Sequence, residues 1–150
     1  MNPDFQPNPD QQTMPLILSK PRTVAVVGLS PKPHRDSFEV SRYMQAQGWR
    51  VVPVNPVAAA SGERILGEVV YASLTDAARV EAIDLVNVFR NSIDVPPIVD
   101  EALALGLPAL WLQLGVVHPE AVAKARAAGL QVVQDRCLMV EHARHVAQRG

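Results

Sequence analysis

The sequence predicts an α/β protein in which a parallel β-sheet is covered by helices on both faces, a three-layer arrangement. Short apolar runs rich in Val, Leu and Ile recur along the chain, and segments of helical pattern separate them. The runs are continuous rather than alternating, as is typical of strands buried on both faces. Because parallel strands need crossover connections, this alternation predicts helices on both faces and right-handed crossovers.

The predicted strands are short and end in loops that contain Gly, Asn or Pro. The first reads Thr-Val-Ala-Val-Val, and its β-branched content favours a central position in the sheet. The expected strands cover residues 23–27, 50–54, 84–89, 109–114 and 130–133.

The predicted helices lie between or after these strands, and several have clear end signals. Pro119 stands at the first position of one helix and Gly129 just past its end, the asymmetry that helices prefer. A short apolar piece at 15–19 precedes the first strand, and 57–73 is expected to be irregular, with at most one short strand. The expected helices cover 37–47, 74–80, 96–105, 118–128 and 138–148.

Length and composition fit one domain with a sizeable core. Residues 1–14 are rich in Pro and polar side chains, so we expect a flexible arm there and one domain over 15–150. The net charge of -1 argues against broad binding of nucleic acid or anionic membrane. The chain has one cysteine, no signal-peptide pattern and no apolar run near the ~20 residues of a membrane span, so a cytoplasmic location is expected.

The loop after the first strand, residues 28–37, is the strongest candidate site. Gly28 permits a sharp exit, Ser30 and Ser37 offer hydroxyls, and Lys32 and Arg35 add positive charge. An anion at the following helix start typically gains about 0.3–1 kcal/mol from the helix dipole. Ligands of parallel sheets bind at these strand ends, so the loop predicts a phosphate site. A connecting loop with solvated cations is the alternative.

The usual NAD pattern is absent from this loop. Leu29, Ser30, Pro31, Lys32 and Pro33 follow Gly28, so Gly-x-Gly-x-x-Gly is missing. The second strand ends in Asn-Pro, without the acid that would accept from ribose hydroxyls. No Gly-Lys-Ser/Thr follows the first strand either, which excludes a P-loop. The expected ligand is therefore a phosphorylated nucleotide held in another way.

Six short motifs occur in a fixed order across residues 23–143. Together they resemble the small stand-alone CoA-binding proteins, related to the N-terminal CoA-binding domain of the succinyl-CoA synthetase alpha subunit. The motifs are Gly28-Leu29-Ser30, Arg35-Asp36-Ser37, Pro53-Val54-Asn55-Pro56, Val88-Phe89-Arg90, Trp111-Leu112-Gln113-Leu114-Gly115 and Asp135-Arg136-Cys137.

The resemblance implies a Rossmann-like domain that holds CoA across the strand ends. The pyrophosphate would lie on the first loop, at Gly28, Leu29, Ser30, Lys32, Arg35 and Ser37. Val54, Asn55 and Pro56 would border the adenosine, and Phe89 and Arg90 would face the cofactor from the other side. Similar proteins often carry Lys or Arg directly after Asn-Pro, whereas Val57-Ala58-Ala59-Ala60 follows here. Either Arg64 substitutes in the contact with the 3′-phosphate, or the affinity for CoA is lower.

The leading expectation is a non-catalytic protein that binds CoA or a short acyl-CoA. A ligase of the related kind needs a phosphorylated histidine in a second domain and a nucleotide-grasping partner, which 150 residues do not accommodate. The alternatives are a ligase subunit acting in trans, an atypical NADP-dependent oxidoreductase, or a thiol protein in which Cys137 carries CoA as a disulfide. A homodimer is plausible from base rates.

Other side chains receive structural interpretations. Arg90 is expected either to contact the ligand or to pair with Asp84 or Asp94, and Trp111 to lie in the core. We expect His118 to cap its helix. His142 and His145 are expected on a solvated helix face, and no metal site is predicted.

Overall fold

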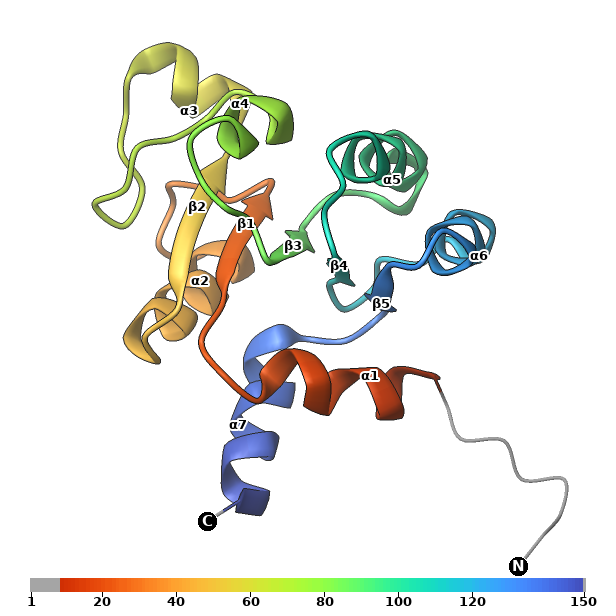
Figure 1. Cartoon of the computed structure of the whole chain (residues 1–150). Helices are drawn as coiled ribbons and strands as arrows, with labels where there is room; N and C mark the ends of the chain where they lie inside the picture. Colours follow the sequence, from red (N-terminus) through yellow and green to blue (C-terminus); the bar gives the residue numbers. More distant parts are fainter. Residues whose placement is uncertain (1–8, 150) are drawn as a thin grey trace, which may run out of the picture.

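The computed structural model describes residues 9–149, and within them five parallel strands form one sheet in the order β2-β1-β3-β4-β5 (Figure 1). Each apolar run that predicted a strand forms one. Three of the strands are shorter than expected: two end earlier, because the chain leaves the sheet at Phe89 and Gln113, and the last begins one residue later. The strands are β1 (Thr23–Val27), β2 (Arg50–Val54), β3 (Leu85–Val88), β4 (Ala109–Leu112) and β5 (Gln131–Val133).

Helices cover both faces of the sheet, which confirms the three-layer α/β prediction. One face packs against α4, α5 and α6, and the other against α1, α2, α3 and α7. The helices are α1 (Pro9–Leu18), α2 (Asp36–Ala46), α3 (Pro56–Ser61), α4 (Leu74–Ala78), α5 (Val95–Ala104), α6 (Pro119–Ala127) and α7 (Leu138–Arg149), with a 3-10 turn, η1 (Ser92–Asp94), before α5. None of the helices described is long and apolar enough to cross a membrane.

The chain changes direction across the sheet at β1. It passes from β1 to β2 through α2 on one face, and then from β3 to β4 through α5 on the opposite face. Crossover connections between parallel strands are right-handed. A connection that runs one way across the sheet therefore packs on one face, and a connection that runs the other way packs on the opposite face. The loops after β1 and β3 therefore diverge, and a crevice opens between these neighbouring strand ends.

The N-terminal helix α1 corrects the expectation of a flexible arm over residues 1–14. Residues 1–8 lie outside the described part of the chain, but 9–14 belong to a helix that continues through Pro15. Asp10 in its first turn is 6% exposed and lies 2.8 Å from Nη2 of Arg126 on α6. This ion pair joins residues 116 positions apart and so could not be read from the local sequence.

A second correction concerns the irregular segment 57–73, which begins with helix α3. The side chain of Asn55 accepts hydrogen bonds from the backbone N–H groups of Val57 and Ala58, and Gly62 ends the helix with φ +72°. Further along, Tyr71 forms a parallel bridge with Val54 beside β2. This edge of the sheet is therefore more regular than the sequence suggested.

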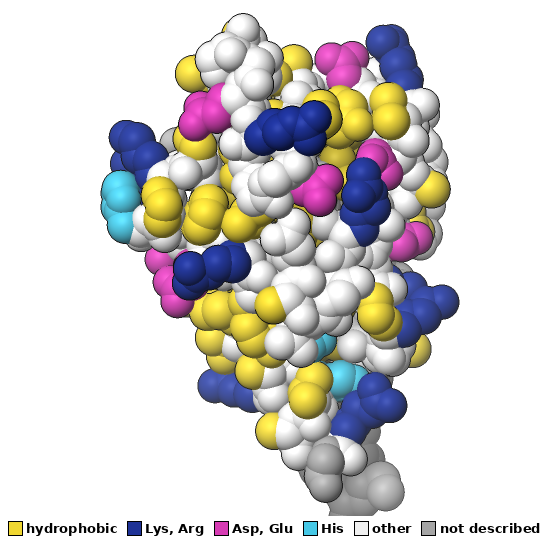
Figure 2. Space-filling model, turned by 90° about the vertical axis from the view of Figure 1, so that its left-hand side faces the viewer, with side chains coloured by type: hydrophobic (Ala, Val, Ile, Leu, Met, Phe, Trp, Pro, Cys, Tyr) yellow, Lys and Arg dark blue, Asp and Glu magenta, His cyan; other side chains and the backbone are white. Residues whose placement is uncertain are grey.

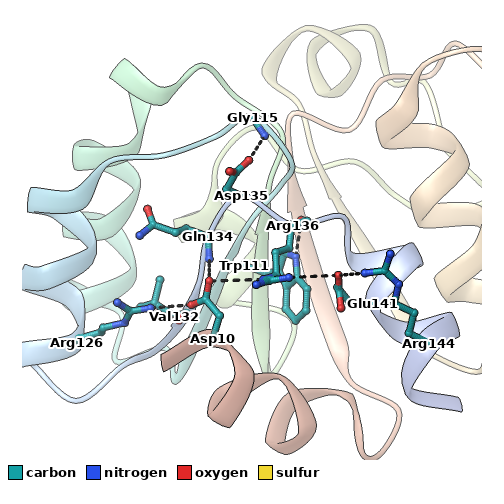
Figure 3. A network of polar contacts seen from close by, with 10 residues as sticks. All are labelled: Asp10, Trp111, Gly115, Arg126, Val132, Gln134, Asp135, Arg136, Glu141 and Arg144. Atoms are coloured by element: carbon teal, nitrogen blue, oxygen red, sulfur yellow. Dashed lines mark hydrogen bonds and ion pairs between the residues drawn. The ribbon is translucent and has the colours of Figure 1, made fainter. Parts of the chain in front are cut away.

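Buried Asp10 belongs to a network that also holds the loop between β5 and α7 (Figure 3). Arg136 in that loop lies 3.8 Å from Asp10, and its carbonyl accepts a 2.9 Å hydrogen bond from the indole N–H of Trp111. The carboxylate of Asp135 accepts from the backbone N–H of Gly115 at 2.8 Å. Trp111 itself is fully buried, as predicted. The network fixes the path of residues 134–137, and Cys137 at its end lines the site described next.

Candidate functional site

Gly28 allows the loops after β1 and β3 to begin in close contact before they turn to opposite faces of the sheet. Its φ is +91°, and a Cβ atom placed there would lie 2.3 Å from the carbonyl oxygen of Phe89. Any side chain would therefore clash with backbone as well as strain the left-handed conformation. The glycine of the first motif is thus required by the geometry of the crevice.

The β1–α2 loop is held open by its own serines. The backbone N–H of Ser30 donates to Oγ of Ser37 at 3.0 Å, and that of Lys32 donates to Oγ of Ser30 at 3.1 Å. Ser37 is 7% exposed and lies in the first turn of α2. Its hydroxyl proton remains available to a ligand, because its oxygen acts as acceptor towards the loop. The loop thus presents a hydroxyl donor beside a helix N-terminus.

The charges at this helix start are mixed. Lys32 and Arg35 are exposed and have no hydrogen bond or ion pair from their side chains to any residue within 9–149. Asp36 and Glu39 line the same wall and oppose an anion. Figure 2 shows the same interspersed pattern on the face towards β2 and α2, where cations are scattered among acids. A phosphate here would depend on a few placed cations.

Two adjoining hollows occupy the strand ends. The larger, of about 750 Å³, extends from the β1–α2 loop to β4 and α7, and the smaller, of about 360 Å³, extends to β2 and α4. Both are lined by Gly28, Ser30, Phe89 and Arg90, so they meet at the crevice between β1 and β3. Together they form an elongated cleft with the candidate phosphate loop near its middle.

Ten of the eleven candidate cofactor-binding residues lie on this cleft. The larger hollow is lined by Gly28, Ser30, Lys32, Arg35, Ser37, Phe89 and Arg90, and the smaller by Gly28, Ser30, Val54, Asn55, Pro56, Phe89 and Arg90. Leu29 is the exception. Its side chain is 0% exposed and packs in the core, because it points to the opposite side from Gly28 and Ser30.

Arg90 and Arg64 have clear local partners. The guanidinium of Arg90 lies 3.5 Å from the carboxylate of Asp94, one of its two expected partners, while its side chain also lines both hollows. Arg64 donates to the carbonyl of Gly67 and lines a separate pocket beside β2. Arg64 lines neither hollow of the cleft, so its position gives no support to the prediction that it replaces the missing cation after Asn-Pro.

Sequence reasoning missed the far end of the larger hollow. It is formed by residues after β4 and at the start of α7: Gln113, Leu114, Val116, Cys137, Met139 and Val140. Gln113 and Cys137 were recognised as strand-end residues, and Cys137 was linked to CoA in one alternative, but neither was among the candidate cofactor-binding residues. Their convergence depends on the β4–β5 pairing and the loop network around Asp135, which no local pattern reveals.

The histidines of α7 correct another expectation. His142 is 6% exposed rather than solvated, and its Nδ1 lies 3.0 Å from the hydroxyl of Tyr43 on α2. Burial, and next the nearby His145, lower the pKa of His142 below its ordinary value. Residues 9–149 hold no group of three or more His, Cys, Asp or Glu side chains placed to bind a metal. His118 caps α6 as predicted, accepting from the backbone N–H of Ala121.

The sheet order, the glycine turn and the cleft at the switch point define a Rossmann-like α/β fold. The model of a CoA binding domain family matches residues 22–143, and the chain belongs to that family.

Relatives cover nearly the whole chain. The uncharacterized protein YneT of Bacillus subtilis is 38% identical over 136 residues, which is 91% of this chain and 96% of YneT. A solved structure from Thermus thermophilus, cell-free ID.343, is 40% identical, with a TM-score of 0.81, over 93% of this chain and 99% of that one. A hypothetical protein from Pyrococcus horikoshii is 33% identical, with a TM-score of 0.83, over 97% and 99% of the two chains.

A larger protein shares the fold. The dinucleotide forming acetyl-coenzyme A synthetase 1 of Ca. Korarchaeum cryptofilum matches with a TM-score of 0.66 at 20% identity. The match covers 81% of this chain but 28% of the synthetase chain.

Proposed function

We propose that this protein binds coenzyme A, free or as a short acyl thioester, without catalysing a reaction on its own. The observation that carries the proposal is the elongated cleft, with the β1–α2 loop near its middle and a hollow on each side. CoA has the same order of parts: a nucleoside, a pyrophosphate and a long pantetheine arm. Membership of the CoA-binding domain family supports the same ligand.

The pyrophosphate would lie at the N-terminus of α2. Ser37 donates its hydroxyl proton there, and Lys32 and Arg35 supply charge-assisted contacts. Adenosine would occupy the smaller hollow, bordered by Val54, Asn55 and Pro56. The pantetheine arm would then pass Phe89 and Arg90 into the larger hollow.

Isothermal titration calorimetry with CoA, acetyl-CoA and NADPH tests the proposal. We expect saturable binding of both CoA species and no measurable heat with NADPH, because the second strand offers no acid for the ribose and no cluster of cations for a 2′-phosphate. Tight NADPH binding without a CoA signal would overturn it.

A subunit of an acyl-CoA ligase acting in trans is the second candidate. The synthetase match favours it, because there the same fold makes up about a quarter of a longer chain. Affinity purification from native lysate, with added CoA, would then recover a partner with a nucleotide-grasping domain. Purification of the chain alone, together with CoA binding, would favour the binding protein.

A further inference from the structure

The far end of the larger hollow differs in chemistry from the phosphate end. Gln113, Leu114, Val116, Cys137, Met139 and Val140 line it, and none of them carries a formal charge. The cations of the hollow belong to the β1–α2 loop and to the residue after Phe89. The far end is therefore suited to an uncharged group that is mostly apolar.

Gln113 places one polar group in this apolar wall, and its neighbours fix the orientation of its amide. Its side-chain oxygen Oε1 accepts hydrogen bonds from the backbone N–H of Leu138 and from Nδ2 of Asn87, each at 3.3 Å. A backbone N–H can only donate, so the oxygen must face it. Nε2 therefore carries the free N–H groups, and it has no hydrogen bond to any other residue described in the structure. Gln113 is 6% exposed and lines the hollow.

Asn87 on β3 holds this orientation from the opposite side. It is 1% exposed, and its Nδ2 also donates to the carbonyl of Trp111 at 3.1 Å, which fixes the direction of its own amide. Its Oδ1 is buried without a hydrogen-bond partner within residues 9–149. An unsatisfied buried oxygen costs stability, so Asn87 is a poor choice for core packing alone. Its geometry instead suits a residue that positions Gln113.

We propose that this end of the cleft binds the acyl group of a neutral, short-chain acyl thioester. Nε2 of Gln113 donates a hydrogen bond to the thioester carbonyl oxygen, and Leu114, Met139 and Val140 contact the alkyl chain. Asn87 acts as a positioning residue for Gln113. An acyl group that ends in a carboxylate would be disfavoured, since no cation lines this end. The inference rests on the proposed binding of CoA and adds the class of acyl group.

Four ligands separate this inference from the proposed function: CoA, butyryl-CoA, succinyl-CoA and the thioether S-butyl-CoA, each titrated calorimetrically under reducing conditions. S-butyl-CoA keeps the alkyl chain but lacks the carbonyl oxygen. We expect butyryl-CoA to bind at least about threefold tighter than S-butyl-CoA and about tenfold tighter than succinyl-CoA. Equal affinities for all four would overturn the inference and leave CoA binding intact. A complete lack of binding would overturn both.

Two variants test the residues. Gln113→Glu keeps an oxygen facing Leu138 but replaces the free donor by an acceptor, and should abolish the preference for butyryl-CoA over S-butyl-CoA. Because a buried carboxylate also opposes folding, Asn87→Leu is the second variant. It removes the orphaned oxygen and one of the two donors that hold Oε1 of Gln113, so its melting temperature should equal or exceed the wild-type value while the preference falls at least about twofold.

If either variant folds and still prefers butyryl-CoA over S-butyl-CoA as the wild type does, the result contradicts the assignment of Gln113 to the thioester carbonyl. So does an equal loss of affinity for CoA and butyryl-CoA in Gln113→Glu. That result would mean that Nε2 of Gln113 donates to an amide carbonyl of the pantetheine arm and not to the carbonyl of the acyl group.

Discussion

The side-chain Nδ2 of Asn55 donates a 3.0 Å hydrogen bond to the carbonyl of Leu29, which ties the loop after β2 to the loop after β1. The other end of the same amide accepts from the backbone N–H groups of Val57 and Ala58 and so begins helix α3. One asparagine thus caps a helix and fixes the spacing of the two loops that would border a nucleotide.

These two roles can be separated by mutation. Asn55→Asp retains the acceptor for the cap but cannot donate to Leu29, whereas Asn55→Ala loses both. We expect Asn55→Ala to lower the free energy of unfolding by about 0.5–2 kcal/mol. Urea denaturation followed by circular dichroism measures this loss.

CoA affinity shows whether the hydrogen bond from Asn55 to Leu29 shapes the binding site or only stabilises the fold. Asn55→Asp should fold with a nearly unchanged urea midpoint but bind CoA more weakly, because the loops separate and a negative charge is added near the ligand. Wild-type affinity in Asn55→Asp would show that the contact with Leu29 does not shape the site.

Arg35 is the second test of the phosphate loop. Arg35→Ala should weaken CoA binding by about 1–3 kcal/mol through the loss of a charge-assisted contact. Arg42→Ala is the matched control, since Arg42 is an exposed arginine of α2 that does not line either hollow. Calorimetric titration of both variants at one ionic strength gives the comparison. Equal affinities in the two would remove Arg35 from the site.

The 3′-phosphate of CoA should contribute little to affinity. Arg90 is the one cation among the described residues that line the smaller hollow, and it is already paired with Asp94. We therefore expect CoA and dephospho-CoA to bind within about threefold of each other. A preference for CoA above about thirtyfold would reveal a cationic contact that the structure does not supply.

Buried His142 predicts a pH dependence of stability. Its pKa is lowered in the folded protein by burial and by His145, so the folded state resists the proton that the unfolded chain accepts near pH 6.5. Stability is therefore fully present above that pH and declines as the pH falls below it. Trp49 and Tyr43 contact the His142 ring from the α2 side.

Thermal unfolding between pH 7.5 and 5 measures the slope. His142→Gln should flatten it, and His34→Gln, at an exposed loop position, should not. A slope that survives in His142→Gln would assign the effect to other groups.

Much of the sheet could be predicted from the sequence because buried parallel strands leave a local signature. Thr23–Val27 and Arg50–Val54 agree with the structure at both ends. Helix α1 escaped prediction because its polar start is stabilised by Arg126, far along the chain. Helix α3 carried recognisable signals, the Asn-Pro start and Gly62 at its end, but its alanines also fit a loop.

The candidate site also has parts that could be predicted from the sequence and parts that could not. The β1–α2 loop and the Asn-Pro bend follow strands directly and could be located from motifs alone. Leu29 is buried because its side chain points into the core and away from the cleft, and the motif alone does not reveal that direction. The orientation of Gln113 depends on Asn87 and Leu138, contacts between strands and a helix that appear only when the sheet is assembled.

A crystal structure of the protein grown with excess CoA tests the central claim most directly. The account predicts electron density for the pyrophosphate at the N-terminus of α2, within hydrogen-bond distance of Ser37, with adenosine over Val54–Pro56 and the pantetheine arm directed to Gln113. Density for CoA at the opposite edge of the sheet, or a cleft that excludes the cofactor at saturating concentration, would contradict it.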